Sequence, residues 1–261
     1  MKVWVRAVSV WGPGMEGWAA SAPILAGGAY VPRASPPPAP ALLPANERRR
    51  TGPVVRLALA VAAEAAGASG LDPVTLRSVF GSANGDGPVV GGILDALAGG
   101  GARAVSPTQF SNSVHNAAAG YWSIATGGAQ PADCVGAGDA TWAAALLTAV
   151  VEVQTLQVPV LLVVYDYPLP PPLDVTRPIL APFAAAFVLA PAGPGQATLD
   201  VAYVPGVAAP DEPDDLALAE LARGNPAAQS LRLLQCLARR TDDDCPAAYG
   251  LGHVTVRVGH D

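Results

Sequence analysis

Residues 139–165 restrict the fold more than any other part of the chain. Residues 140–156 (ATWAAALLTAVVEVQTL) carry apolar side chains at helical spacing, and Asp139 stands where the N-cap of such a helix belongs. The run VPVLLVVY at 158–165 is apolar throughout, and it is too short to cross a membrane. A helix followed by a strand that is apolar on both faces is typical of a parallel sheet covered by helices.

Helical and strand patterns are mixed along the rest of the chain, which predicts one α/β domain over residues 1–261. The proline-rich segment 32–46 is expected to be an extended surface loop. Strands are expected at 2–10, 76–80, 184–189, 197–203 and 253–258, and helices at 54–66, 88–97, 107–119, 216–223 and 227–239.

The composition argues against several classes of protein. Only 14% of the residues are charged, the formal net charge is −6, and no basic stripe runs along the chain, so nucleic acid is not an expected partner. No apolar run is long enough for a membrane span. The three cysteines, Cys134, Cys236 and Cys245, are odd in number and widely spaced, which favours a reducing, cytoplasmic compartment over a disulfide scaffold.

Residues 12–17 (GPGMEG) spell the glycine pattern of a dinucleotide-binding turn directly after the first predicted strand. The residues that follow have no helical pattern, and no acidic residue lies between Trp18 and Asn46 to bind a ribose. A plain glycine-rich turn is therefore the favoured interpretation. Hydrolase, nucleotide and zinc signatures are absent, so neither a cofactor nor a metal is expected.

Four polar residues are open to two interpretations each. His115, within SNSVHN, is either a general base or a hydrogen-bonded structural residue. Cys134 is either reactive or a buried inert thiol, and no basic neighbour favours its thiolate. Asp139 and Asp166 either face each other as paired acids or serve separately as a helix cap and the end of a strand.

A family resemblance rests on several segments together. They are Arg48-Arg49-Arg50, residues 79–85 (VFGSANG), residues 106–116 (SPTQFSNSVHN) and residues 120–122 (GYW). These segments resemble the N-terminal half of β-ketoacyl synthases, and more closely the short synthase-like proteins of aryl polyene and related type II polyketide systems. The resemblance is dense over residues 46–166, and residues 167–261 diverge.

The resemblance implies a thiolase-like fold in its single N-terminal half, with a mixed sheet and buried Ala-rich helices. Active synthases place a nucleophilic cysteine at the start of a buried helix, where the dipole stabilises a thiolate. The corresponding run here is residues 136–141 (GAGDAT), so Asp139 takes the place of the nucleophile. The two histidine runs of active synthases are missing as well, and no catalytic residue is predicted.

The function implied is that of a chain-length factor, a non-catalytic subunit that pairs with an active ketosynthase in type II polyketide or fatty-acid-like biosynthesis. The strand before Asp139 and residues 114–126 are expected to face that partner, and Arg48, Arg49 and Arg50 are candidates for contact with an acyl carrier protein. Candidates for lining the interface or the acyl tunnel are Phe110, His115, Asn116, Tyr121 and Trp122.

Two alternatives remain open. The chain could be an independent acyl-thioester enzyme, such as a decarboxylase, hydrolase or acyltransferase, that uses Asp139 and His115 with Asp166. It could also be an α/β binding module without any polyketide role.

Overall fold

One mixed sheet of nine strands runs through the described part of the protein. The structure is a computed structural model that describes residues 1–100, 105–206 and 211–260. The strand order is β4-β3-β5-β6-β1-β7-β9-β8, with the short β2 paired to β1. Strands β4, β3 and β5 are parallel, and the pairs from β5 through β8 are antiparallel. The predicted α/β class is confirmed.

The strands are β1 (Lys2–Gly12), β2 (Met15–Glu16), β3 (Arg77–Gly81), β4 (Ala132–Val135), β5 (Val160–Asp166), β6 (Phe183–Ala190), β7 (Ala197–Pro205), β8 (Ala247–Tyr249) and β9 (Gly252–Gly259). The helices are α1 (Trp18–Leu25), α2 (Ala45–Arg48), α3 (Pro53–Ala68), α4 (Gly87–Gly100), α5 (Pro107–Asn112), α6 (Ala117–Thr126), α7 (Thr141–Leu156), α8 (Leu216–Gly224) and α9 (Leu231–Arg239).

Both faces of the central strands are covered. Every residue of β5 and β6 is buried. Val160, Leu162 and Val164 belong to a core shared with α7 and α9, whereas the alternate residues of β5 belong to a second core shared with α3 and α6. Side chains of a strand alternate between the faces of a sheet, so a strand covered on both faces must be apolar throughout. This is why the continuous run at 158–165 predicted the strand correctly.

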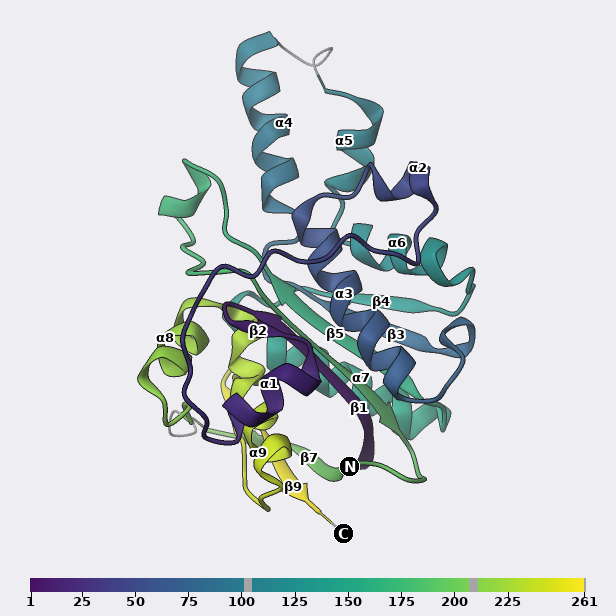
Figure 1. Cartoon of the computed structure of the whole chain (residues 1–261), viewed down its shortest axis with the longest axis vertical. Coiled ribbons are helices and arrows are strands. Elements are labelled where there is room, and N and C mark those ends of the chain that lie inside the picture. The colour runs from purple at the N-terminus through teal and green to yellow at the C-terminus, as the bar shows by residue number, and fades with distance from the viewer. Residues whose placement is uncertain (101–104, 207–210, 261) are drawn as a thin grey trace.

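The helices predicted at 54–66 and 140–156 also form, as α3 and α7. Helix α3 places Leu57, Ala58 and Val61 on one face of the sheet, and α7 places Trp142, Leu146 and Val150 on the other. Figure 1 shows α3 lying along the sheet. Alanine is the most frequent residue in both helices, and its small side chain lets helix backbones lie close to the strands. An added Cβ at Gly81 of β3 would lie 2.8 Å from the Cβ of Ala145 of α7.

A bulge at Arg6 explains why the strand pattern of the N-terminus is imperfect. Val5 pairs with Leu189 of β6 and Ala7 pairs with the adjacent Val188, so Arg6 is an extra residue. Val3 and Val5 face the α9 side before the bulge, and Val8 and Val10 face the same side after it. The extra residue shifts the alternation by one position, so a strict period of two fails across it.

The glycine-rich segment 12–17 is a β-hairpin, and the favoured turn interpretation holds. Gly12 pairs with Met15, and Gly14 has φ of 70°, where an added Cβ would lie 2.5 Å from the Val31 carbonyl oxygen. The expectation that no helix follows was wrong, because α1 begins directly after Gly17. Glu64 of α3 accepts a hydrogen bond from the Trp18 N–H at 2.7 Å. A carboxylate from a distant helix therefore stabilises this helix start, and sequence pattern does not reveal it.

Two expected helices are each divided. The pattern at 107–119 covers α5 and the beginning of α6, with a break at Ser113 to Asn116. The pattern at 227–239 covers a 3₁₀ turn over Pro226–Ser230 followed by α9. Figure 1 shows α4 projecting beyond the sheet, with α5 beside it. Among the described residues, no helix is long and apolar enough to span a bilayer.

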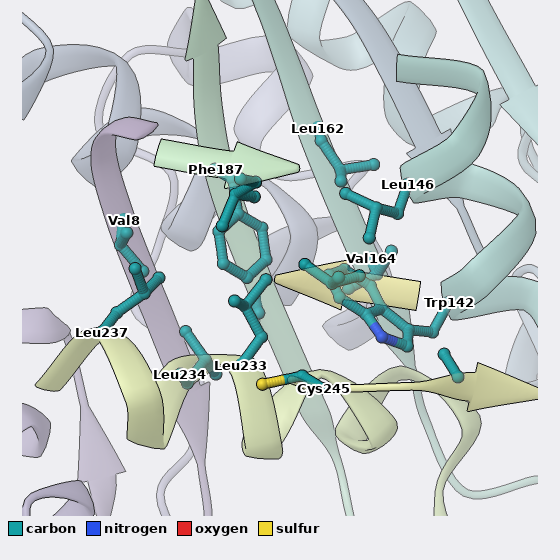
Figure 2. Close-up of a cluster of buried hydrophobic side chains, with 14 of the residues drawn as sticks. Val8, Trp142, Leu146, Leu162, Val164, Phe187, Leu233, Leu234, Leu237 and Cys245 are labelled. Atoms are coloured by element: carbon teal, nitrogen blue, oxygen red, sulfur yellow. The ribbon is translucent and has the colours of Figure 1, made fainter. Parts of the chain in front are cut away.

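Phe187 of β6 lies at the centre of the core on the α9 side. Figure 2 shows its ring among Val8, Val164 and the leucines of α9. The ring is 1% exposed, and its centroid is 5.5 Å from that of Trp142.

We expect Phe187→Ala to lower the free energy of unfolding by about 3 to 5 kcal/mol, because it removes a buried ring and leaves a cavity. Urea unfolding followed by circular dichroism measures the change. The control is Val151→Ala on α7, where the side chain is 41% exposed, and it should change stability by about 0.5 kcal/mol or less. Equal effects of the two substitutions would contradict this account of the core.

Candidate functional site

The candidate site lies where the parallel strands β3, β4 and β5 end. The segment 82–86 follows β3, residues 136–140 follow β4, and Asp166 is the last residue of β5. The carboxyl ends of parallel strands lie at one edge of a sheet, so the fold brings these segments together. The first helical turn of α7 begins at the same edge.

Asp166 is the buried centre of this edge. Its side chain is 0% exposed, and its Oδ1 accepts hydrogen bonds from the Ser82 hydroxyl at 3.0 Å and the Ala83 N–H at 2.9 Å. The Oδ2 atom is buried without a hydrogen-bond partner. Burial raises the pKa of Asp166 to about 6, although the hydrogen bonds from Ser82 and Ala83 and the charge of Arg177 favour the ionised form.

Ser82, His115 and Asp166 do not form a catalytic triad. The Ser82 hydroxyl donates to Asp166 and accepts from the Gly85 N–H at 2.9 Å. His115 contacts the backbone carbonyl oxygen of Ser82, with 2.9 Å between Nε2 and that oxygen. A base must reach the proton of the nucleophile, and here the imidazole is bonded to a carbonyl oxygen instead. The geometry therefore matches the structural interpretation of His115.

Asp139 is not the N-cap of α7, contrary to the prediction. Residues Gly138–Ala140 form a 3₁₀ turn before the helix, and Ala140 occupies the cap position. The Thr141 hydroxyl donates to the Gly138 carbonyl at 2.7 Å and accepts from the Ala137 N–H at 3.0 Å, so it stabilises the turn. The Asp139 side chain is 82% exposed and forms an ion pair with Arg177 at 2.6 Å.

The two predicted acids thus have separate partners. Asp139 binds Arg177, whereas Asp166 binds Ser82 and the backbone that follows it. Arg177 lies 38 residues after Asp139, in a loop without any recognisable motif, so sequence reasoning missed it. Ser82 and Asp166 are 84 residues apart, and only the pairing of β3 with β5 brings them together.

Cys134 lies on β4, as predicted, and its side chain is half-buried and packs beside the core on the α3 side. Burial and the neighbouring Asp133 raise the pKa of the Cys134 thiol. A raised pKa reduces the thiolate fraction at neutral pH, which makes a poor nucleophile. Among the described residues, no group of His, Cys, Asp and Glu is arranged to bind a metal ion.

The candidate interface residues divide into a buried and an exposed set. Tyr121 and Trp122 of α6 are core residues with 8% and 4% exposure, and the Tyr121 hydroxyl donates to Asn112 at 3.1 Å. Phe110 of α5 is 67% exposed. Asn116 is exposed and lies with Tyr121 along a pocket of about 380 Å³.

The arginines Arg48, Arg49 and Arg50 differ in their surroundings. Arg48 donates to the Leu43 carbonyl at 2.9 Å and so holds the proline-rich loop. Arg50 lines the same pocket as Tyr121 and pairs with Glu47 at 3.3 Å. Arg49 is exposed to solvent. The three residues therefore do not present a uniform cationic surface.

The raised pKa of Asp166 makes stability depend on pH. The folded protein binds a proton between pH 3.8 and about 6 that the unfolded chain releases. Stability from this group is therefore present at low pH and lost as the pH rises through about 6, by up to about 3 kcal/mol.

We expect Asp166→Asn to abolish this pH dependence, so that wild type loses stability relative to the variant between pH 4 and pH 7. Urea unfolding at several pH values measures the difference. Asp95→Asn, which removes an exposed carboxylate on α4, is the control and should follow the wild-type curve. Parallel curves for wild type and Asp166→Asn would contradict the assignment.

Comparisons with solved structures agree with the fold. A ketosynthase (ApeO) in complex with its chain length factor (ApeC) from Xenorhabdus doucetiae matches with a TM-score of 0.72 and 19% identity over 100% of both chains. The ishigamide ketosynthase/chain length factor matches with a TM-score of 0.68 and 17% identity over 98% of both chains. The AntDE:AntF complex, a type II acyl carrier protein with its ketosynthase, matches with a TM-score of 0.77 and 12% identity over 99% of both.

Because the identities are below 20%, the structural matches establish the fold alone, which is the thiolase-like ketosynthase fold. No curated protein matches the sequence. A family model described as the β-ketoacyl synthase N-terminal domain matches residues 18–247, which includes most of the segment where the resemblance was thin. The chain therefore belongs to the β-ketoacyl synthase family through this N-terminal domain.

Proposed function

We propose that the protein is a non-catalytic, chain-length-factor-like subunit that pairs with an active ketosynthase. Asp139 carries the proposal, because it stands where the family resemblance places the nucleophilic cysteine and is held by Arg177 at 2.6 Å. Two solved relatives are described as pairs of a ketosynthase with a chain length factor, which supports the same function.

Other groups do not replace the missing nucleophile. An acyl thioester is attacked by a thiolate, and a paired carboxylate is a poor substitute for one. The half-buried thiol of Cys134 lies on β4, before the turn that leads to α7. His253 lies on β9 and His260 follows it, and β6, β1 and β7 separate β9 from β5 in the sheet. Of the three histidines, only His115 lies near Asp166 and Ser82.

The free edge of β4 is the proposed docking element. On the β3 side, the Ser78 N–H donates to the Pro131 carbonyl, and the Ser82 N–H donates to the Val135 carbonyl. In a parallel ladder, alternate residues bond to the same neighbour, so the backbone groups of Ala132 and Cys134 point away from β3. Among the described residues, no strand pairs with that side of β4. An exposed edge of this kind accepts a strand from another chain.

Exposed apolar side chains extend the proposed interface beyond the edge. Phe110 is 67% exposed, Ile124 49% and Val114 44%. These residues lie on or between α5 and α6, and α6 packs beside β3 and β4. Exposed apolar groups next to a free sheet edge are typical of a surface that a partner covers. Val114 and Ile124 of this surface fall within residues 114–126, which the resemblance assigns to the ketosynthase contact.

The finer assignments follow from the same resemblance. The biosynthetic system in which the subunit works is of the aryl polyene type. An acyl carrier protein delivers the growing acyl chain to the ketosynthase, and Arg49 is an exposed candidate for contact with that carrier protein. The complex works in the cytoplasm, since an odd number of cysteines does not fit the disulfide scaffold of an exported protein. The carrier complex among the solved relatives supports the carrier-protein role.

We expect the isolated protein to form no acyl adduct with acyl or malonyl thioesters. Intact mass spectrometry after incubation measures adduct formation, with an active ketosynthase as the positive control. Labelling of Asp139 or Cys134, or turnover that Asp139→Ala abolishes, would instead establish an independent enzyme.

We expect Ala132→Pro to prevent copurification with a coexpressed type II ketosynthase, because proline removes an outward N–H. Proline is tolerated at the first residue of an edge strand, so the midpoint of thermal unfolding should change little. Ala132→Ser keeps the N–H and is the matched control. Undiminished copurification of Ala132→Pro would rule out docking through β4.

A further inference from the structure

Cys236 and Cys245 are in contact in the core. Cys236 belongs to α9, and Cys245 lies just before β8. Their Sγ atoms are 3.1 Å apart, and the two residues are 0% and 4% exposed. Figure 2 shows the sulfur of Cys245 directed at the helix that carries Leu233 and Leu234. The odd number and unequal spacing of the three cysteines predict no disulfide scaffold, but the fold brings these two together.

The backbone on both sides of the pair is held in place. The Cys245 N–H donates to the Val256 carbonyl of β9 at 2.8 Å, and the Thr241 N–H donates to the Cys236 carbonyl at 3.1 Å. A disulfide has an S–S distance of about 2.05 Å. The two sulfur atoms must therefore approach by about 1 Å for the bond to form.

A cation lies next to the pair. Nη1 of Arg232 is 3.4 Å from Sγ of Cys236. Arg232 is itself held by Asp211 at 2.9 Å and by Asp243 at 2.5 Å. The hydrogen bond from Cys245 and the charge of Arg232 lower the pKa of the Cys236 thiol, and they outweigh burial and the two carboxylates. Cys236 is therefore the thiol of the pair that loses its proton more readily, because the same contact raises the pKa of the Cys245 thiol.

We propose that Cys236 and Cys245 are an oxidisable pair that forms an intramolecular disulfide, with a small peroxide as the oxidant. The Cys236 thiolate attacks one oxygen of hydrogen peroxide and the O–O bond breaks. Hydroxide departs as the leaving group, and Cys236 becomes a sulfenic acid. Cys245 then attacks that sulfur, the S–OH bond breaks, and the S–S bond forms. Hydroxide takes up the thiol proton, so two thiols and one peroxide give one disulfide and two waters.

The disulfide adds a covalent link between two elements that already share the core on the α9 side. It closes a loop that contains Asp242, Asp243 and Asp244, and it fixes α9 to the segment that begins the β8–β9 hairpin. Asp243 pairs with Arg232 and Asp244 with Arg257, so the ion pairs already hold the loop in the arrangement that the bond requires. Because the cross-link constrains the unfolded chain, the oxidised protein is more resistant to unfolding.

Peptide mapping tests the proposal on the wild-type protein. The protein is treated with hydrogen peroxide, denatured, alkylated without reduction and digested with trypsin, which cleaves between the two cysteines after Arg239 and Arg240. We expect residues 233–239 and 241–257 to appear as one linked species, two hydrogen atoms lighter than the separate peptides. Cys134 should remain alkylated, and the midpoint of thermal unfolding should rise by about 5 °C.

The controls separate this bond from unspecific oxidation. Cys134→Ser should form the linked species to the same extent, whereas Cys236→Ser and Cys245→Ser should not form it. Three alkylated cysteines after peroxide treatment, a sulfinic acid on Cys236, or disulfides between chains through Cys134 would each overturn the proposal. These readouts do not involve a ketosynthase, so they are independent of the proposed function.

Discussion

The need to cover both faces of the central strands governs this structure. β5 and β6 alternate between two cores, and neither core is complete without its own layer of helices. The large buried area comes from Val, Leu and Phe on the strands, while Ala-rich helices lie close to them. Gly81 allows the closest of these approaches, between β3 and α7. The low fraction of charged residues follows from this, because charged side chains cannot be buried at most positions of the central strands.

Sequence reasoning succeeded where a local pattern matched the tertiary environment. The helix at 140–156 and the strand at 158–165 were predicted well. Burial along one side of a helix gives apolar residues at helical spacing, and burial of both faces of a strand gives a continuous apolar run. It failed where a distant residue decides the local structure. Helix α1 depends on Glu64, and its interior contains Pro23, so local propensity gave no reason to expect it.

The candidate site shows the same division. Asp166 at a strand end could be anticipated from the alternation of helix and strand. Its partner Ser82 could not, and neither could the Arg177 that holds Asp139, since both contacts join segments without a shared motif. The contact of Cys236 with Cys245 was missed for a related reason, because the segment before β8 is held against β9 through Cys245 and Val256. In each case the tertiary arrangement, and no local pattern, brings the side chains together.

The brevity of β4 has a consequence for how a partner is chosen. The strand has four residues, follows Pro131 and carries an exposed Asp133, all features that discourage indiscriminate strand pairing. Its outward backbone groups offer only a few hydrogen bonds, each with a modest net contribution. In the docking proposed above, the edge sets the alignment of an incoming strand but supplies little affinity. Discrimination between the cognate partner and other chains then falls to exposed side chains of the neighbouring α6, such as Ile124, which can vary because the core does not need them.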